Sequence, residues 1–200
     1  MGRVNTEKQI ATGAAVLVGA GALVWLWRRG GGSFRAELVE RARADLGIAE
    51  TSKNDGPEVR QYLANVNQPP GQNWCAGAVW TWIRDAAERS GSPRVLEVIP
   101  PTGSAKALAD GPKLAGWWLP VETVRASSER PPPGSVPIWD RSVPPGSSWE
   151  GHIGVLESWD GDTFKSIEGN SGPTWDRVAR MERALADPRL LGFVVFPESP

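Results

Sequence analysis

Proline is distributed unevenly along this 200-residue chain, and this limits the architectures that the chain can adopt. Of its 18 prolines, 14 lie beyond residue 98. Proline breaks helix interiors and is excluded from most central strand positions, so the second half can hold only short elements. The apolar runs between these prolines predict short strands at 136–139, 152–159, 163–168, 177–181 and 191–196.

The first half predicts helices instead. Three helical stretches follow one another, at 34–46, 57–66 and 74–89. Asp55 is a suitable N-cap for the second stretch, and Gly91 a suitable end for the third. Helices followed by strands indicate an α+β fold, in which the helices pack on a small antiparallel sheet.

Before these helices, residues 9–27 carry no charge. As a helix this segment would be roughly 28 Å long, close to the thickness of a bilayer's hydrocarbon core. We therefore expect one transmembrane helix, with a cleaved signal peptide or a buried core helix as the alternatives. The expected organisation has three parts: a membrane anchor or signal-anchor at 1–29, a linker at 30–33 and a folded domain at 34–200.

Charge and composition exclude several classes of protein. The 22 Lys and Arg nearly cancel the 23 Asp and Glu, so no nucleic-acid partner is expected. The single cysteine, Cys75, cannot form a disulfide within the chain. The single histidine, His152, leaves too few ligands for a Cys/His zinc site, so we expect no metal and no cofactor.

Cys75 and His152 are nevertheless the residues most suited to chemistry. Cys75 begins the third predicted helix, whose positive end should lower the thiol pKa; a buried structural cysteine is the alternative. His152 begins a predicted strand and could serve as a base. Glu168 and Asn170 share one face of the next strand, and either could orient the imidazole ring.

The hairpin formed by strands 152–159 and 163–168 must meet one condition for this arrangement. A simple two-residue turn would point Glu168 and Asn170 to the wrong face. We therefore expect a three-residue turn or a bulge, which pairs His152 with Asn170 and leaves Glu168 as a diagonal neighbour.

Four short motifs occur in an order that resembles the CHAP family, the cysteine, histidine-dependent amidohydrolases/peptidases. They are Trp-Cys-Ala at 74–76, Pro-Gly-Ser-Val at 133–136, Gly-His-Ile-Gly-Val at 151–155 and Glu-Gly-Asn at 168–170. The resemblance covers about residues 50 to 197. It departs at Gly134-Ser135, where members commonly have Gly-Asp.

The resemblance implies a papain-like fold and cleavage of an amide bond in peptidoglycan through a cysteine thioester. It implies Cys75 as nucleophile, His152 as base, Glu168 as orienter and Asn170 as a further polar member of the site. The bond would be that of an N-acetylmuramoyl-L-alanine amidase or of a peptide-stem endopeptidase. Trp74 and Trp149 flank the two catalytic candidates, so we expect them to bind substrate as cleft walls.

Other readings of the same residues stay open. An NlpC-type, transglutaminase-like or other papain-like cysteine enzyme would use the same nucleophile and base on another amide. A catalytically inactive cell-wall-binding or scaffold module would keep the fold without the chemistry.

Location raises two conflicting arguments. More positive residues follow the 9–27 segment than precede it, which favours a cytoplasmic domain. Peptidoglycan lies outside the membrane, however, and the Ala/Gly-rich segment resembles the signal-arrest-release anchors of some phage endolysins. We expect a protein anchored in the membrane through residues 9–27, with its catalytic domain facing the cell wall.

Overall fold

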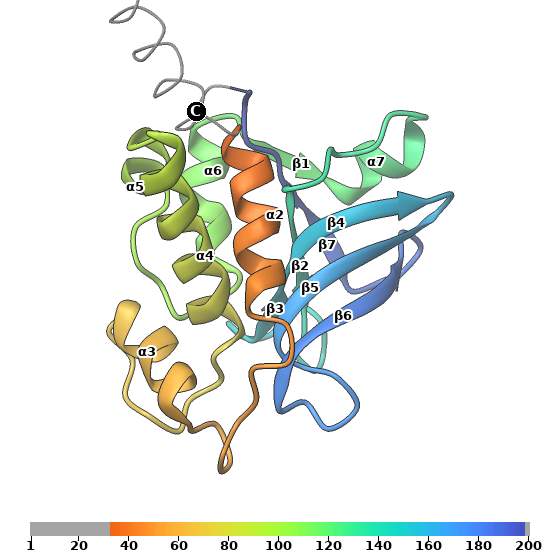
Figure 1. Cartoon of the computed structure of the whole chain (residues 1–200). Coiled ribbons are helices and arrows are strands. Elements are labelled where there is room, and N and C mark those ends of the chain that lie inside the picture. The colour runs from red at the N-terminus through yellow and green to blue at the C-terminus, as the bar shows by residue number, and fades with distance from the viewer. Residues whose placement is uncertain (1–32, 199–200) are drawn as a thin grey trace, which may run out of the picture. The chain divides into compact units, whose positions relative to one another are not determined.

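The computed structural model describes residues 33–198. Figure 1 shows most of its helices on one side and its strands on the other, with α7 beside the strands. The helices are α2 (Phe34–Ala44), α3 (Pro57–Asn65), α4 (Cys75–Ser90), α5 (Arg94–Val98), the 3-10 helix η1 (Ala107–Ala109), α6 (Asp110–Leu114) and α7 (Val121–Ala126). The strands are β1 (Trp118–Pro120), β2 (Val136–Asp140), β3 (Gly151–Ile153), β4 (Val155–Asp160), β5 (Thr163–Ser171), β6 (Arg177–Ala184) and β7 (Leu190–Val194).

The strands form two small antiparallel sheets, so the expectation of one sheet is wrong. One sheet has the order β1-β7-β2-β3 and the other has the order β4-β5-β6. The chain passes from the first sheet to the second at Gly154, which splits the expected strand 152–159 into β3 and β4. A Cβ on Gly154 would lie 2.7 Å from the Cγ of Glu168, so only glycine lets the chain cross β5 this closely.

The hairpin of β4 and β5 differs from the expected register. Its turn has two residues, since Asp160 pairs with Thr163. Strand β4 carries a bulge between Leu156 and Ser158. The expected bulge is therefore present. The expected pairing of His152 with Asn170 is wrong, because His152 lies in β3 and pairs with Trp139 of β2.

The expectation of a transmembrane helix also needs correction. The longest described helix, α4, has 16 residues, or about 24 Å, and it carries charged side chains. Within residues 33–198, no helix combines the length and the apolar character needed to cross a membrane. The segment 9–27 lies outside the described residues. The predicted membrane anchor and the predicted membrane-anchored location, with the domain facing the wall, are therefore not retained.

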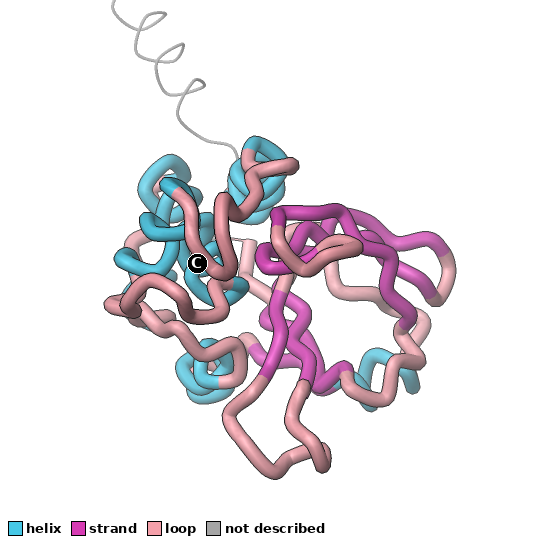
Figure 2. Tube along the Cα trace, turned by 90° about the horizontal axis from the view of Figure 1, so that it is seen from below, coloured by secondary structure: helices cyan, strands magenta, loops and turns pink. Residues whose placement is uncertain are grey.

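Helix α4 is the element that positions the functional residues. It contacts α2, α3, α5, β3 and β5, and most of its residues are buried. Figure 2, seen from below, shows the helices gathered beside the strands. Small residues at the start of α4 permit these contacts: a Cβ on Gly77 would lie 2.7 Å from the carbonyl oxygen of Tyr62 in α3. A Cβ on Gly169 of β5 would likewise lie 2.7 Å from the ring of Trp74. Strand β5 therefore crosses close to the first turn of α4.

A buried carboxylate joins the three longer helices. Asp45 follows α2 and is only 6% exposed. It accepts hydrogen bonds from the Tyr62 hydroxyl of α3 (2.5 Å) and from the Trp82 indole of α4 (2.8 Å). Arg41 of α2 donates to its other oxygen. Because one acceptor serves donors on α2, α3 and α4, it fixes their relative positions.

Candidate active site

Cys75 is the first residue of α4, where the backbone N–H groups of the first turn have no carbonyl partner within the helix. Its side chain lines a cavity of about 240 Å³. Arg141, Trp149 and Asn170 line the same cavity. A carbonyl oxygen placed against this helix start would meet backbone N–H donors and the positive end of the helix dipole.

His152 and Glu168 form a buried pair that joins the two sheets. The Nε2 of His152 in β3 lies 2.7 Å from an Oε of Glu168 in β5, and both side chains are almost fully buried. Arg183 of β6 donates to both oxygens of the same carboxylate. The hydroxyls of Ser166 and Ser171 also donate to it.

These contacts determine the charge of Glu168. Burial would raise the pKa of this carboxyl, but hydrogen bonds from Arg183 and His152 lower it to about 2. Glu168 is therefore ionised at neutral pH and accepts the hydrogen bond from His152.

The same contacts determine the tautomer of His152. Burial lowers the pKa of His152 below its usual value, although the hydrogen bond to Glu168 opposes this shift. A neutral His152 carries its proton on Nε2, facing Glu168, and a lone pair on Nδ1. That Nδ1 is buried and has no hydrogen-bond partner among the described residues. His152 can thus accept a proton at Nδ1.

The expected fall in the thiol pKa is not found. Burial raises the pKa of Cys75 to about 11, although the positive charge of Arg141 and the backbone N–H of Ala76 oppose this rise. Desolvation therefore outweighs the nearby positive charge and the backbone N–H groups at the helix start. The thiol is protonated at neutral pH, and nucleophilic attack would need a base.

We predict that iodoacetamide labels Cys75 slowly at about pH 7 and progressively faster toward about pH 10, because only the thiolate reacts. Mass spectrometry of the native protein across this range gives the labelling rate. The denatured chain is the control, and its rate should follow an ordinary thiol pKa of about 8.5. A rate in the native protein that is already maximal at about pH 7 would contradict the raised pKa.

Asn170 lines the Cys75 cavity, whereas Trp74 does not. The Asn170 amide donates to the side chains of Glu50 and Asn54 and to the carbonyl of Trp175, so it orders these loops rather than the imidazole. Trp74 is fully buried and donates to Glu50. It is therefore a core residue behind Cys75 and not a wall of the cleft.

Trp149, by contrast, is 65% exposed and lines the Cys75 cavity. The structure thus places Trp149 and Asn170 with Cys75 around one cavity, and it joins His152 to Glu168 by a hydrogen bond.

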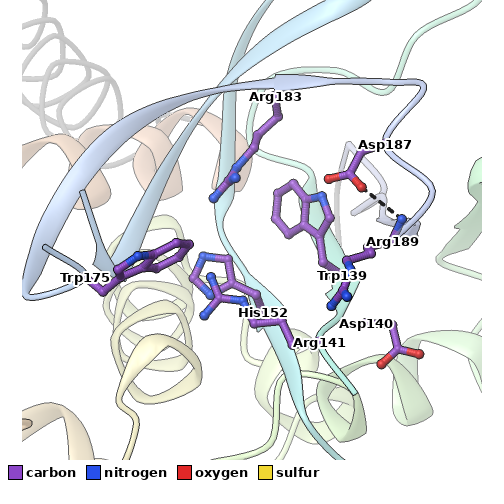
Figure 3. A pocket seen from close by; sticks show the side chains of 8 residues that line it. All are labelled: Trp139, Asp140, Arg141, His152, Trp175, Arg183, Asp187 and Arg189. Carbon is purple, nitrogen blue, oxygen red and sulfur yellow. Dashed lines mark hydrogen bonds between the residues drawn. The ribbon is translucent and has the colours of Figure 1, made fainter. Parts of the chain in front are cut away.

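A second cavity, of about 370 Å³, contains His152. Figure 3 shows Trp139 and Trp175 on opposite sides of the imidazole, with ring centroids 5.8 and 6.4 Å away. Arg141 lines this cavity as well as the Cys75 cavity. Sequence reasoning missed these three residues, because tryptophan is frequent throughout the chain and Arg141 belongs to none of the four motifs.

Nothing in residues 33–198 forms a cluster of three or more His, Cys, Asp or Glu side chains placed to hold a metal ion.

Comparisons with known proteins give limited similarity. No family model matches the chain, and no curated protein matches it. A solved structure described as "The crystal structure of Ly7917" is 19% identical, with a TM-score of 0.47, and the match covers 82% of this chain. "The crystal structure of Ly7917 with the hydrolyzing product of MDP" is 18% identical, with a TM-score of 0.46 and the same coverage. The match spans 62% of the length of each of these structures.

Proposed function

We propose that this protein is a cysteine-dependent hydrolase that cleaves an amide bond of peptidoglycan, as the resemblance to the CHAP family implies. The bond is that of an N-acetylmuramoyl-L-alanine amidase or of a stem endopeptidase. The observation that supports this most is the buried pair of His152 and Glu168, which leaves Nδ1 of the imidazole without a partner among the described residues. Buried polar atoms are nearly always hydrogen-bonded, so a histidine that only stabilised the fold would be expected to have both ring nitrogens paired.

The mechanism begins with a neutral thiol and a neutral imidazole. The Cys75 sulfur attacks the amide carbonyl while its proton passes to Nδ1 of His152. Glu168, ionised and held by Arg183, stabilises the imidazolium that forms. Backbone N–H groups at the start of α4 stabilise the oxyanion.

The second half of the reaction reverses the proton transfer. The imidazolium of His152 protonates the leaving amine as the carbon–nitrogen bond breaks, which leaves a thioester on Cys75. Water then attacks the thioester and gives a proton to His152. The imidazolium returns this proton to the Cys75 sulfur as the carbon–sulfur bond breaks, and the carboxylic acid product leaves. The starting protonation states are thereby restored.

One observation favours a second candidate function, an inactive cell-wall-binding module. Burial raises the pKa of Cys75 to about 11, as expected of a structural thiol. An NlpC-type or other papain-like peptidase remains a third reading, since it would use the same residues on another amide.

The full chain incubated with peptidoglycan sacculi and with muramyl dipeptide tests these proposals. We expect new amino groups, and the masses of the products identify the bond that is cut. Cys75→Ala should release none while still binding sacculi in a sedimentation assay. Binding without release by the unsubstituted protein would indicate the inactive module. Cleavage of unrelated peptides but not of sacculi would indicate the third reading.

A further inference from the structure

Arg141 occupies a distinctive place in the site. It follows β2 and lines both the Cys75 cavity and the His152 cavity. Its guanidinium carbon lies 4.5 Å from the centre of the Trp175 ring (Figure 3). Stacking of this kind holds the guanidinium plane and leaves its N–H edges free to bind.

Among residues 33–198, the Arg141 guanidinium has no acidic partner. No hydrogen bond or ion pair joins its side chain to any residue in the part of the chain that the structure describes, and the influences on its pKa are burial and more distant charges. Burial lowers the pKa of Arg141, but a guanidinium keeps its proton in proteins. An unpaired charge that is partly removed from water is costly, so a ligand that brought an anion to it would gain free energy.

The surroundings of Arg141 favour an anion. Arg183 and Arg189 line the same cavity, and only Arg183 is paired with a described carboxylate. Of the two acids in this cavity, Asp140 is bound to Lys106 (2.6 Å). Asp187 accepts the backbone N–H of Arg189, drawn as a dashed line in Figure 3. Positive charge therefore exceeds negative charge around the cavity.

Another polar side chain of this cavity wall belongs to Trp139. The indole Nε1 of Trp139 is buried and has no acceptor among the described residues, and Trp139 is only 4% exposed. Buried donors in native proteins are nearly always paired. This N–H is covered, so a ligand could reach it only if the indole ring moved.

We propose that Arg141 binds a carboxylate of the substrate that lies next to the scissile amide. This inference rests on the proposed function and narrows it: the substrates are wall peptides whose carboxylates are free rather than amidated. The position of Arg141 carries the argument, because a carboxylate on its N–H edge would stand between the cavity of the nucleophile and the cavity of the base.

The test uses the full chain and two forms of one muropeptide, with free carboxylates and with the same carboxylates converted to primary amides. We expect kcat/KM to be about 10- to 100-fold higher for the free acid, because a charge-assisted hydrogen bond usually contributes a factor of about this size. Arg141→Gln should reduce this ratio to about one, and Arg141→Lys should retain part of it. Arg89→Gln is the matched control, since Arg89 is an exposed arginine at the end of α4 and its variant should keep the full ratio.

Two results would overturn the inference while leaving the proposed function intact. One is equal cleavage of both forms by the unsubstituted protein. The other is an equal loss on both forms in Arg141→Gln, which would mean that Arg141 acts through the thiol or the fold. Thermal unfolding monitors the fold, and Arg141→Lys carries the test if the Gln variant does not fold.

Failure to cleave either form would count against the proposed function alone. The Cys75→Ala variant then provides a binding measurement by calorimetry with the same two muropeptides. Tighter binding of the free acid that disappears in the double variant with Arg141→Gln would support the inference. Equal binding of the two forms would overturn it.

Discussion

Glu168→Gln is expected to lower kcat by about 10⁴-fold, the loss seen when the carboxylate that orients a catalytic histidine becomes an amide. The two side chains have nearly the same shape, so the change removes charge rather than volume. An amide can offer its N–H₂ to His152 and thereby select the wrong tautomer, with the proton on Nδ1. It also fails to stabilise the imidazolium, and it leaves the guanidinium of Arg183 without its carboxylate partner.

Hydrolysis of muropeptides, followed by release of amino groups, measures this loss. Glu157→Gln is the matched control: Glu157 is also a buried carboxylate, held by Arg43 and Arg180, and it does not contact His152. We expect both variants to lose stability and only Glu168→Gln to lose kcat. Equal kcat losses in the two variants would mean that the Glu168 effect reflects the fold and not the proposed catalytic role.

The second large effect concerns stability. Asp45→Ala is expected to lower the free energy of unfolding by about 3–5 kcal/mol, the usual result of removing one partner of a buried charged network. The change leaves the Tyr62 hydroxyl, the Trp82 indole and the charge of Arg41 without their shared acceptor. Urea unfolding followed by tryptophan fluorescence measures the change.

Asp85→Ala is the control for this effect, because Asp85 pairs with the same Arg41 at 2.8 Å but lies nearer the surface. A partly exposed ion pair of this kind contributes about 1 kcal/mol or less. A similar loss in both variants would show that the ion pair with Arg41 dominates, and that the buried donors of α3 and α4 contribute little.

Local features of the sequence predicted several elements correctly. The predicted helix at 74–89, with Gly91 as its end, matches α4 to within one residue at each boundary. The predicted strand at 163–168 lies within β5, where Glu168 is buried and contacts His152. Helix ends and strand faces depend on residues close in the chain, so a sequence is sufficient to reveal them.

Features that depend on distant residues could not be predicted in this way. The change of sheet at Gly154 depends on its contact with Glu168, and the raised pKa of Cys75 depends on burial under several elements. The amide of Asn170 bonds to Glu50, which is 120 positions away. Periodicity carries no information about such contacts, so it could not show that the Asn170 amide bonds to these loops rather than to the imidazole.

The change of sheet at Gly154 has a consequence for how the protein would lose activity. His152 belongs to one sheet and Glu168 to the other, so their hydrogen bond depends on the docking of the two sheets as well as on either sheet alone. Proteins open in cooperative units whose local stabilities differ. A partial opening that separated the sheets would disconnect the proposed base from its orienter while each sheet kept its own hydrogen bonds. On heating, activity would then be lost before secondary structure. Backbone amide hydrogens where the two sheets meet, around Gly154, would exchange faster than those within either sheet.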